Sequence, residues 1–221
     1  MKNNLTELVF ILDRSGSMAD FEADTVGGFN STIERQKKGE GKVYVSTLLF
    51  DNYSKVIHDR VDINEIKPMD LATYQVGGMT ALLDAVGGAI RHIGNIHKYA
   101  RPEDVPEHTV FVINTDGMEN ASRNYTRAEV RNMIKEKTDK HGWEFIFLAA
   151  NIDAEGTAEG IGIKRERAVN FAKDSVGMEE SYMAICGAIS AVRSCSSDSL
   201  DSGEWRARLD EDNNRRKNGK K

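Results

Sequence analysis

Residues 8–17 read LVFILDRSGS, an apolar run that ends in an acid followed by two serines. Five consecutive large or β-branched apolar residues are typical of a short strand that is buried on both faces. In an open parallel sheet, ligands bind at the loops that leave the carboxyl ends of the strands. The stretch therefore predicts that Asp13, Ser15 and Ser17 lie on such a loop, which Gly16 allows to bend tightly.

The side chains of this loop suggest two roles. One carboxylate and two hydroxyls are hard oxygen ligands, which suit Mg²⁺, Mn²⁺ or Ca²⁺ and suit zinc poorly. Asp and Ser are also preferred residues at the start of a helix, where their side chains cap free backbone N–H groups. The stretch alone leaves both roles open.

The rest of the chain predicts an alternation of strands and helices. Strands are expected at 43–50, 54–61, 109–115, 143–149 and 168–171, and helices at 20–38, 82–93, 125–141, 153–161 and 175–194. The strands 43–50 and 54–61 are too close in sequence for a parallel connection, so they must pair antiparallel. The predicted fold is an α/β, doubly wound, mostly parallel sheet with one antiparallel edge strand and helices on both faces, which is a Rossmann-like arrangement.

The bulk composition favours one domain with a short tail. The 221 residues carry a net charge of −5, which gives no reason to expect a nucleic-acid partner. We predict a domain over residues 1–195 and a flexible, polar and basic tail over 196–221. The apolar run near the amino end is too short for a signal peptide or a membrane span, and no membrane association is expected. Cys186 and Cys195 are expected to be free thiols, which favours a cytoplasmic location.

Two further segments place oxygen ligands at the same edge of the predicted sheet. Asp116 directly follows the buried strand 109–115, and Thr80 opens a helix after the pair Gly77-Gly78. The carboxyl ends of parallel strands meet at one edge of the sheet. Asp13, Ser15, Ser17, Thr80 and Asp116 are therefore expected to converge on one spot.

This pattern resembles a known metal site. Asp-x-Ser-x-Ser, a distant Thr and a strand-end Thr-Asp-Gly are similar to the metal-ion-dependent adhesion site of von Willebrand factor A domains, a pattern shared by integrin inserted domains. The resemblance extends over about residues 7–194 and implies a stand-alone domain of prokaryotic or phage type. It implies that Ser15, Ser17 and Thr80 bind the metal through their hydroxyls. It also implies that Asp13 and Asp116 bind it directly or through water.

The charge balance of such a site suggests what it does. A closed calcium site usually gathers several carboxylates, whereas here two acids and three neutral hydroxyls would face a dication. The expected ion is Mg²⁺, with Mn²⁺ or Ca²⁺ possible. It would keep residual positive charge and an exchangeable water, which an Asp or Glu of a protein partner can replace. The expected function is a metal-dependent protein-binding adaptor and not an enzyme.

Enzymatic alternatives find less support in the sequence. The chain lacks a P-loop and a dinucleotide-binding glycine pattern, and its histidines show no zinc spacing. A hydrolase that uses the same cation to activate water is the remaining alternative. It would need a general base beyond the five ligands.

Several residues beside the predicted ligands have two possible roles each. Three methionines flank the predicted ligands, namely Met18, Met79 and Met118. They either form an apolar rim around the metal or fill gaps between the loops and the core. Arg14 either steers an acidic ligand or points outward. Glu119 and Asn120 either set the choice of partner or belong to a solvated loop.

Overall fold

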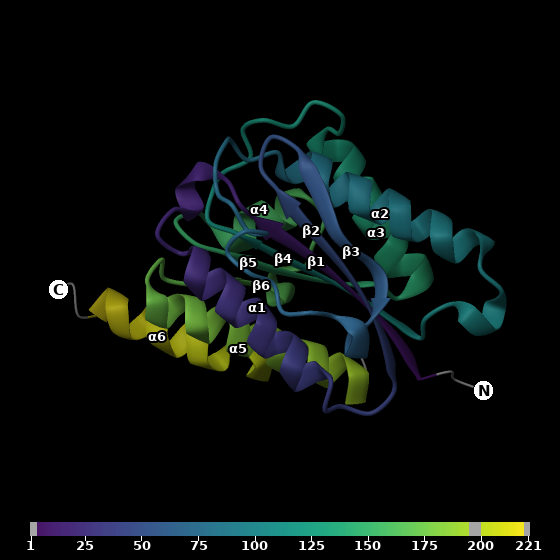
Figure 1. Ribbon diagram of the computed structural model, residues 1–221. Helices are drawn as coiled ribbons and strands as arrows, with labels where there is room; N and C mark the ends of the chain where they lie inside the picture. Colours follow the sequence, from purple (N-terminus) through teal and green to yellow (C-terminus); the bar gives the residue numbers. More distant parts are fainter. Residues whose placement is uncertain (1–3, 195–199, 219–221) are drawn as a thin grey trace.

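The computed structural model describes residues 4–194 and 200–218. Within them, six strands form one sheet in the order β3-β2-β1-β4-β5-β6 (Figure 1). The strands are β1 (Leu5–Asp13), β2 (Lys42–Phe50), β3 (Ser54–Asp62), β4 (His108–Thr115), β5 (Glu144–Ala149) and β6 (Ala168–Asn170). All neighbours pair in parallel except β3, which is antiparallel to β2. The predicted doubly wound sheet with one antiparallel edge strand is confirmed.

Strand β1 lies in the middle of the sheet, and all its residues are buried. Successive side chains of a strand point to opposite faces. Phe10 accordingly packs into one core cluster, while Val9 and Ile11 pack into the other. The continuous apolar run is therefore explained by two covered faces.

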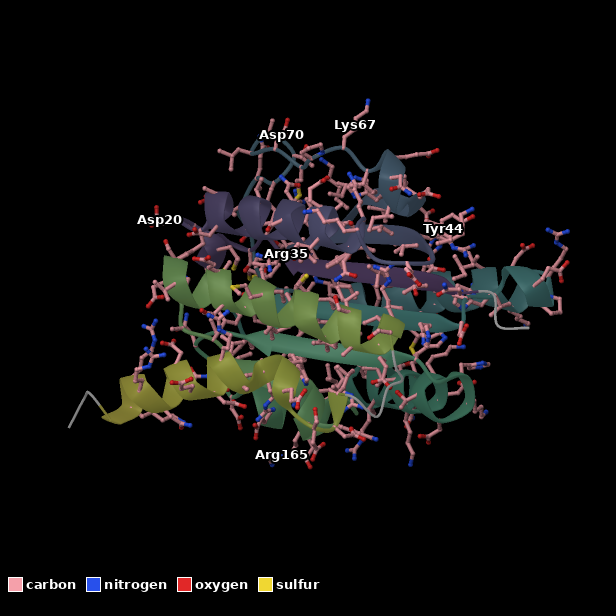
Figure 2. All side chains as sticks on the ribbon, turned by 90° about the horizontal axis from the view of Figure 1, so that it is seen from below. Asp20, Arg35, Tyr44, Lys67, Asp70 and Arg165 are labelled. Atoms are coloured by element: carbon pink, nitrogen blue, oxygen red, sulfur yellow. The ribbon has the colours of Figure 1, made fainter. Side chains whose placement is uncertain are left out.

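Helices cover both faces of the sheet. They are α1 (Glu22–Gln36), α2 (Leu82–Tyr99), α3 (Arg127–His141), α4 (Ala154–Gly160), α5 (Ser175–Ser194) and α6 (Ala207–Asn218). The helices α1, α5 and α6 lie side by side on one face, and α2, α3 and α4 cover the other (Figures 1 and 2). None of the described helices combines the length and the apolar composition that a membrane-spanning helix requires.

The helices α1 and α5 fit closely against each other. The ring of Tyr182 packs on the backbone of Gly28, where an added Cβ would lie 2.1 Å from the Tyr182 Cδ2 atom. Gln36 Nε2 donates to the carbonyl of Cys186 (3.1 Å) and to Ser190 Oγ (3.0 Å). The Cys186 thiol is free, as predicted, and it is buried, whereas Cys195 lies outside the described residues.

The prediction of a flexible tail over 196–221 is wrong for the part that the structure describes. Residues 200–218 contain a 3-10 turn (Glu204–Arg206) and helix α6. Leu200, Trp205 and Leu209 are buried in the core beside α5. These three apolar side chains give the segment a face to bury, which its polar composition conceals. Residues 196–199 and 219–221 lie outside the described residues.

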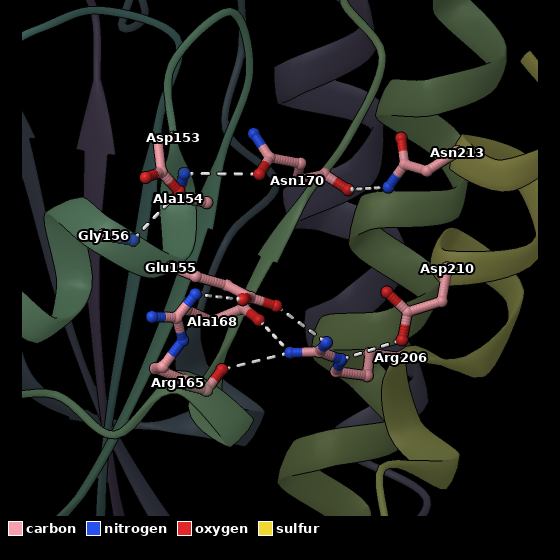
Figure 3. Close-up of polar contacts among 10 residues, drawn as sticks. All are labelled: Asp153, Ala154, Glu155, Gly156, Arg165, Ala168, Asn170, Arg206, Asp210 and Asn213. Atoms are coloured by element: carbon pink, nitrogen blue, oxygen red, sulfur yellow. Dashed lines mark hydrogen bonds and ion pairs between the residues drawn. The ribbon is translucent and has the colours of Figure 1, made fainter. Parts of the chain in front are cut away.

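Polar contacts attach this segment to the edge of the sheet (Figure 3). Arg206 forms ion pairs with Glu155 (3.0 Å) and Asp210 (2.8 Å), and it donates to the carbonyl of Ala168. Asn213 Nδ2 donates to the carbonyl of Asn170 (2.7 Å). The outer carbonyls of β6 are thus paired, so this edge of the sheet is covered.

Candidate metal site

Three loops meet at the carboxyl edge of the sheet. They are the loop after β1 with its 3-10 turn (Gly16–Met18), residues 77–81 before α2, and residues 116–120 after β4. The first two are joined by hydrogen bonds from Gly16 N to the carbonyl of Gly78 (3.1 Å) and from Gly77 N to the carbonyl of Arg14 (2.9 Å). Because β1 and β4 are parallel neighbours, their ends lie side by side. The topology therefore brings the predicted ligands together.

The predicted ligands on these loops face one small space. Ser17 Oγ donates to Asp116 Oδ1 (2.6 Å) and lies 3.0 Å from Ser15 Oγ. A methyl group added at Gly117 would lie 2.9 Å from Thr80 Oγ1 and 3.4 Å from Ser17 Oγ. Both hydroxyls therefore border the space that the missing side chain of Gly117 leaves open. The capping role of the serines finds no support, because no side-chain cap bond is made at either helix that follows.

Asp13 at the end of β1 is almost fully buried. Its carboxylate accepts hydrogen bonds from Ser15 N (2.7 Å) and from Thr115 Oγ1 (2.5 Å). Burial raises the pKa of Asp13. Hydrogen bonds from Thr115 and Ser15 oppose the rise, and the nearby charge of Asp116 adds to it. A carboxylate fixed in this way is suited to orient a metal-bound water.

The loop after β4 is tied to the first turn of α2. Asn120 Oδ1 accepts from Thr80 N (2.9 Å), and the Glu119 carboxylate accepts from Leu83 N (2.9 Å). Asp84 in turn accepts from the backbone N–H groups of Asn124 (2.8 Å) and Tyr125 (2.9 Å). Glu119 and Asn120 thus hold the loop in place, which a simple solvated loop would not require.

For the three methionines and for Arg14, the structure distinguishes between the two roles that the sequence left open. Met18 is buried in the core, whereas Met79 and Met118 expose 48% and 71% of their surface on the site loops. An apolar rim can therefore include two of the three methionines. Arg14 forms an ion pair with Asp51 (2.8 Å), so its charge is held at the turn between β2 and β3.

Three residues that contact this site were not predicted from the sequence. Thr115 Oγ1 donates to Asp13, and the Tyr74 hydroxyl donates to the Asp13 carbonyl. Lys173 Nζ lies 2.8 Å from Asp116 Oδ2 in an ion pair, and it also donates to the carbonyl of Ser17. Lys173 could have been found from its position just after β6, at the same edge of the sheet as the predicted ligands.

The donor set fits a hard divalent cation. Among residues 4–194 and 200–218, no three His, Cys, Asp or Glu side chains cluster as a metal site. The five converging residues instead offer two carboxylates and three hydroxyls, all oxygen donors of the kind that Mg²⁺, Mn²⁺ and Ca²⁺ prefer.

Comparisons with known proteins bear on the fold. No protein-family model and no curated protein matches the chain. Among solved structures, proximal thread matrix protein 1 from the mussel byssus has a TM-score of 0.54 at 13% identity, over 82% of this chain and 45% of that chain. A von Willebrand factor type A structure from Catenulispora acidiphila has a TM-score of 0.54 at 12% identity, over 86% of this chain and 43% of that chain.

A further structure of the mussel protein is described as having a zinc-occupied MIDAS motif. Its TM-score is 0.52 at 16% identity, over 82% of this chain and 46% of that chain. This chain spans less than half the length of these three structures. At such low identities the likeness establishes the fold alone, which is that of von Willebrand factor A domains.

Proposed function

We propose that this chain is a metal-dependent protein-binding module. In this proposal Ser15, Ser17 and Thr80 hold a divalent cation through their hydroxyls, and Asp13 and Asp116 hold it directly or through water. The observation that carries the proposal is the close group formed by Ser15 Oγ, Ser17 Oγ and Asp116 Oδ1, with separations of 3.0 and 2.6 Å. The open space left by Gly117 beside Thr80 supports it further.

The charge of the site favours an acidic partner. The protein contributes two carboxylates, and one of them is already paired with Lys173. A bound dication would supply a coordination position that an Asp or Glu side chain of a partner can fill. The exposed side chains of Met79 and Met118 would provide apolar contact around that acid.

The ion that we propose is Mg²⁺, with Mn²⁺ and Ca²⁺ as chemically similar alternatives. Oxygen-only ligands favour these ions over zinc. The zinc in the mussel structure is a property of that protein and does not decide the ion here.

The test is isothermal titration of the wild-type chain and of Asp13→Ala with Mg²⁺ and Mn²⁺. We expect wild type to bind and Asp13→Ala to bind at least about tenfold more weakly, since outer partners of metal ligands contribute 10- to 100-fold. Equal binding by the two chains would remove the proposal. Binding of Asp- and Glu-containing peptides in Mg²⁺, and its loss in EDTA, then tests the docking step.

The alternative is a hydrolase that uses the same cation to activate water. Among the described residues beyond the five proposed ligands, the charged side chain that pairs with one of them is Lys173, whose ammonium contacts Asp116 and the carbonyl of Ser17. No contact at the site therefore favours hydrolysis. Turnover of p-nitrophenyl phosphate in the presence of Mn²⁺, lost in Asp13→Ala, would support the hydrolase instead.

A further inference from the structure

Lys173 brings a positive charge into the candidate metal site. Its ammonium lies 2.8 Å from Asp116 Oδ2 and donates to the carbonyl of Ser17, so it bridges two of the three site loops. Its Nζ also lies 5.3 Å from the centre of the Phe21 ring. The Asp116 side chain is fully buried and that of Lys173 is 23% exposed. The lysine thus covers the acid from the solvent side.

The chain on both sides of Lys173 is fixed. Phe171 N donates to the carbonyl of Ala149 (3.0 Å), which continues the β6 pairing up to the lysine. Asp174 Oδ1 accepts from Gly177 N (2.8 Å) and so caps the start of α5. Arg216 of α6 forms an ion pair with Asp174. The lysine therefore extends toward Asp116 from a stretch of chain that is anchored on both sides.

Two cations that use the same carboxylate compete. Asp116 Oδ1 accepts from Ser17, and Oδ2 faces the ammonium. A divalent ion that approaches Asp116 must share or displace the lysine, and like charges at such short range repel strongly in a buried site. In the absence of metal, the same ammonium offsets the cost of a buried carboxylate.

We propose that Lys173 is a resident cation that stabilises the metal-free site and lowers its affinity for divalent ions. This inference rests on the proposed function of the same site. Within that site, Lys173 positions the Asp116 carboxylate and sets the affinity for divalent ions. Replacing the ammonium by a neutral side chain then has two opposite effects. The metal-free chain becomes less stable because Asp116 is left buried and unpaired, and the affinity for divalent ions increases.

The experiment compares Lys173→Gln and Lys173→Met with wild type. Lys173→Gln keeps a donor for the Ser17 carbonyl, so it guards against loss of the loop structure. Lys173→Arg keeps the charge. Lys135→Met makes the same change of net charge at an exposed position on α3 and serves as the matched control. Mn²⁺ affinity is measured by electron paramagnetic resonance, and Tm is measured in EDTA and in Mg²⁺.

We expect the two neutral Lys173 variants to bind Mn²⁺ at least about tenfold more tightly than wild type. Their Tm should be lower in EDTA and should rise more than that of wild type on addition of Mg²⁺. Lys173→Arg and Lys135→Met should resemble wild type. Unchanged or weaker Mn²⁺ binding by both neutral variants would overturn the inference and leave the proposed function standing. An equal gain in Lys135→Met would also overturn it. Absence of Mn²⁺ binding by every chain would overturn both proposals.

Discussion

Gly117→Ala should weaken metal binding without unfolding the protein. The added Cβ would lie 2.9 Å from Thr80 Oγ1 and 3.4 Å from Ser17 Oγ. Real Cβ atoms essentially never approach a neighbour more closely than 3.0 Å, so the Thr80 hydroxyl must move. The backbone of Gly117 is not in the left-handed region, so alanine adds no backbone strain there. The substitution therefore acts on the ligand geometry and leaves the fold in place.

The size of the effect follows from which groups move. One proposed ligand, Thr80, is displaced, and a second, Ser17, is crowded. Disturbing groups that orient metal ligands costs about 10- to 100-fold in metal affinity, which corresponds to about 1.4–2.8 kcal/mol of binding free energy. The effect on the free energy of unfolding without metal should stay below about 1 kcal/mol, as for a small change outside the core.

The assay is titration with Mn²⁺, together with urea unfolding in EDTA. Gly88→Ala is the control, because a Cβ at Gly88 in α2 meets no atom within 4 Å. It should leave the Mn²⁺ affinity unchanged. If folded Gly117→Ala binds Mn²⁺ as tightly as wild type, Thr80 and Ser17 do not share a metal at this space, and the assignment of the site is wrong.

Two other predictions concern stability and pH. Gly28→Ala should lower the free energy of unfolding by about 1–3 kcal/mol, because the new methyl overlaps the Tyr182 ring. Asp84→Asn should lower the free energy of unfolding by about 1–2 kcal/mol at pH 7 by weakening hydrogen bonds to charged oxygen. Burial raises the pKa of Asp84, but backbone N–H groups outweigh it and hold the pKa below the ordinary 3.8. The contribution of Asp84 is therefore complete above 3.8 and is lost as the pH falls through the folded value.

Each of these two predictions has its own check. Gly27→Ala in the same helix should raise the free energy of unfolding by up to about 1 kcal/mol, since its Cβ meets open space and alanine favours a helix. A stabilising Gly28→Ala would show that α1 and α5 are not in close contact. Urea unfolding of Asp84→Asn and wild type from pH 7 to 3 should show a shrinking difference. A constant or growing difference would contradict the role given to Asp84.

The sequence predicted the sheet and the meeting of Asp13 and Asp116 at one of its edges because one physical rule controls both. A strand buried on both faces carries a continuous apolar run, here residues 8–12 of β1 and 110–113 of β4, and Asp13 and Asp116 stand just after these runs. The strands are parallel neighbours, which brings these ends together. Helix limits were also readable where capping is local, as at α3, where Thr126 precedes the helix and Glu129 in its first turn completes a capping box.

The features that the sequence did not predict share a different physical origin. Lys173 follows a strand of three residues, too short to be marked by a long apolar run, and a lone lysine has no motif. The role of Tyr74 depends on a long irregular segment whose path only tertiary packing decides. In the tail, Trp205 and Leu209 stand among many charged residues, and ion pairs such as Arg206 with Glu155 neutralise charges that look solvated in the sequence. Contacts between distant segments leave no local periodicity to detect.

The two edges of the sheet are protected from further strand pairing in different ways. This bears on how copies of the chain behave at high concentration. At β6, the carbonyls of Ala168 and Asn170 are taken by Arg206 and Asn213. At β3, the pairing with β2 shifts register, and Arg60 has a φ of +51°. An irregular outer strand is a poor template for a further strand, and so is a border capped by a helix. Neither edge favours strand-by-strand polymerisation of copies of the chain.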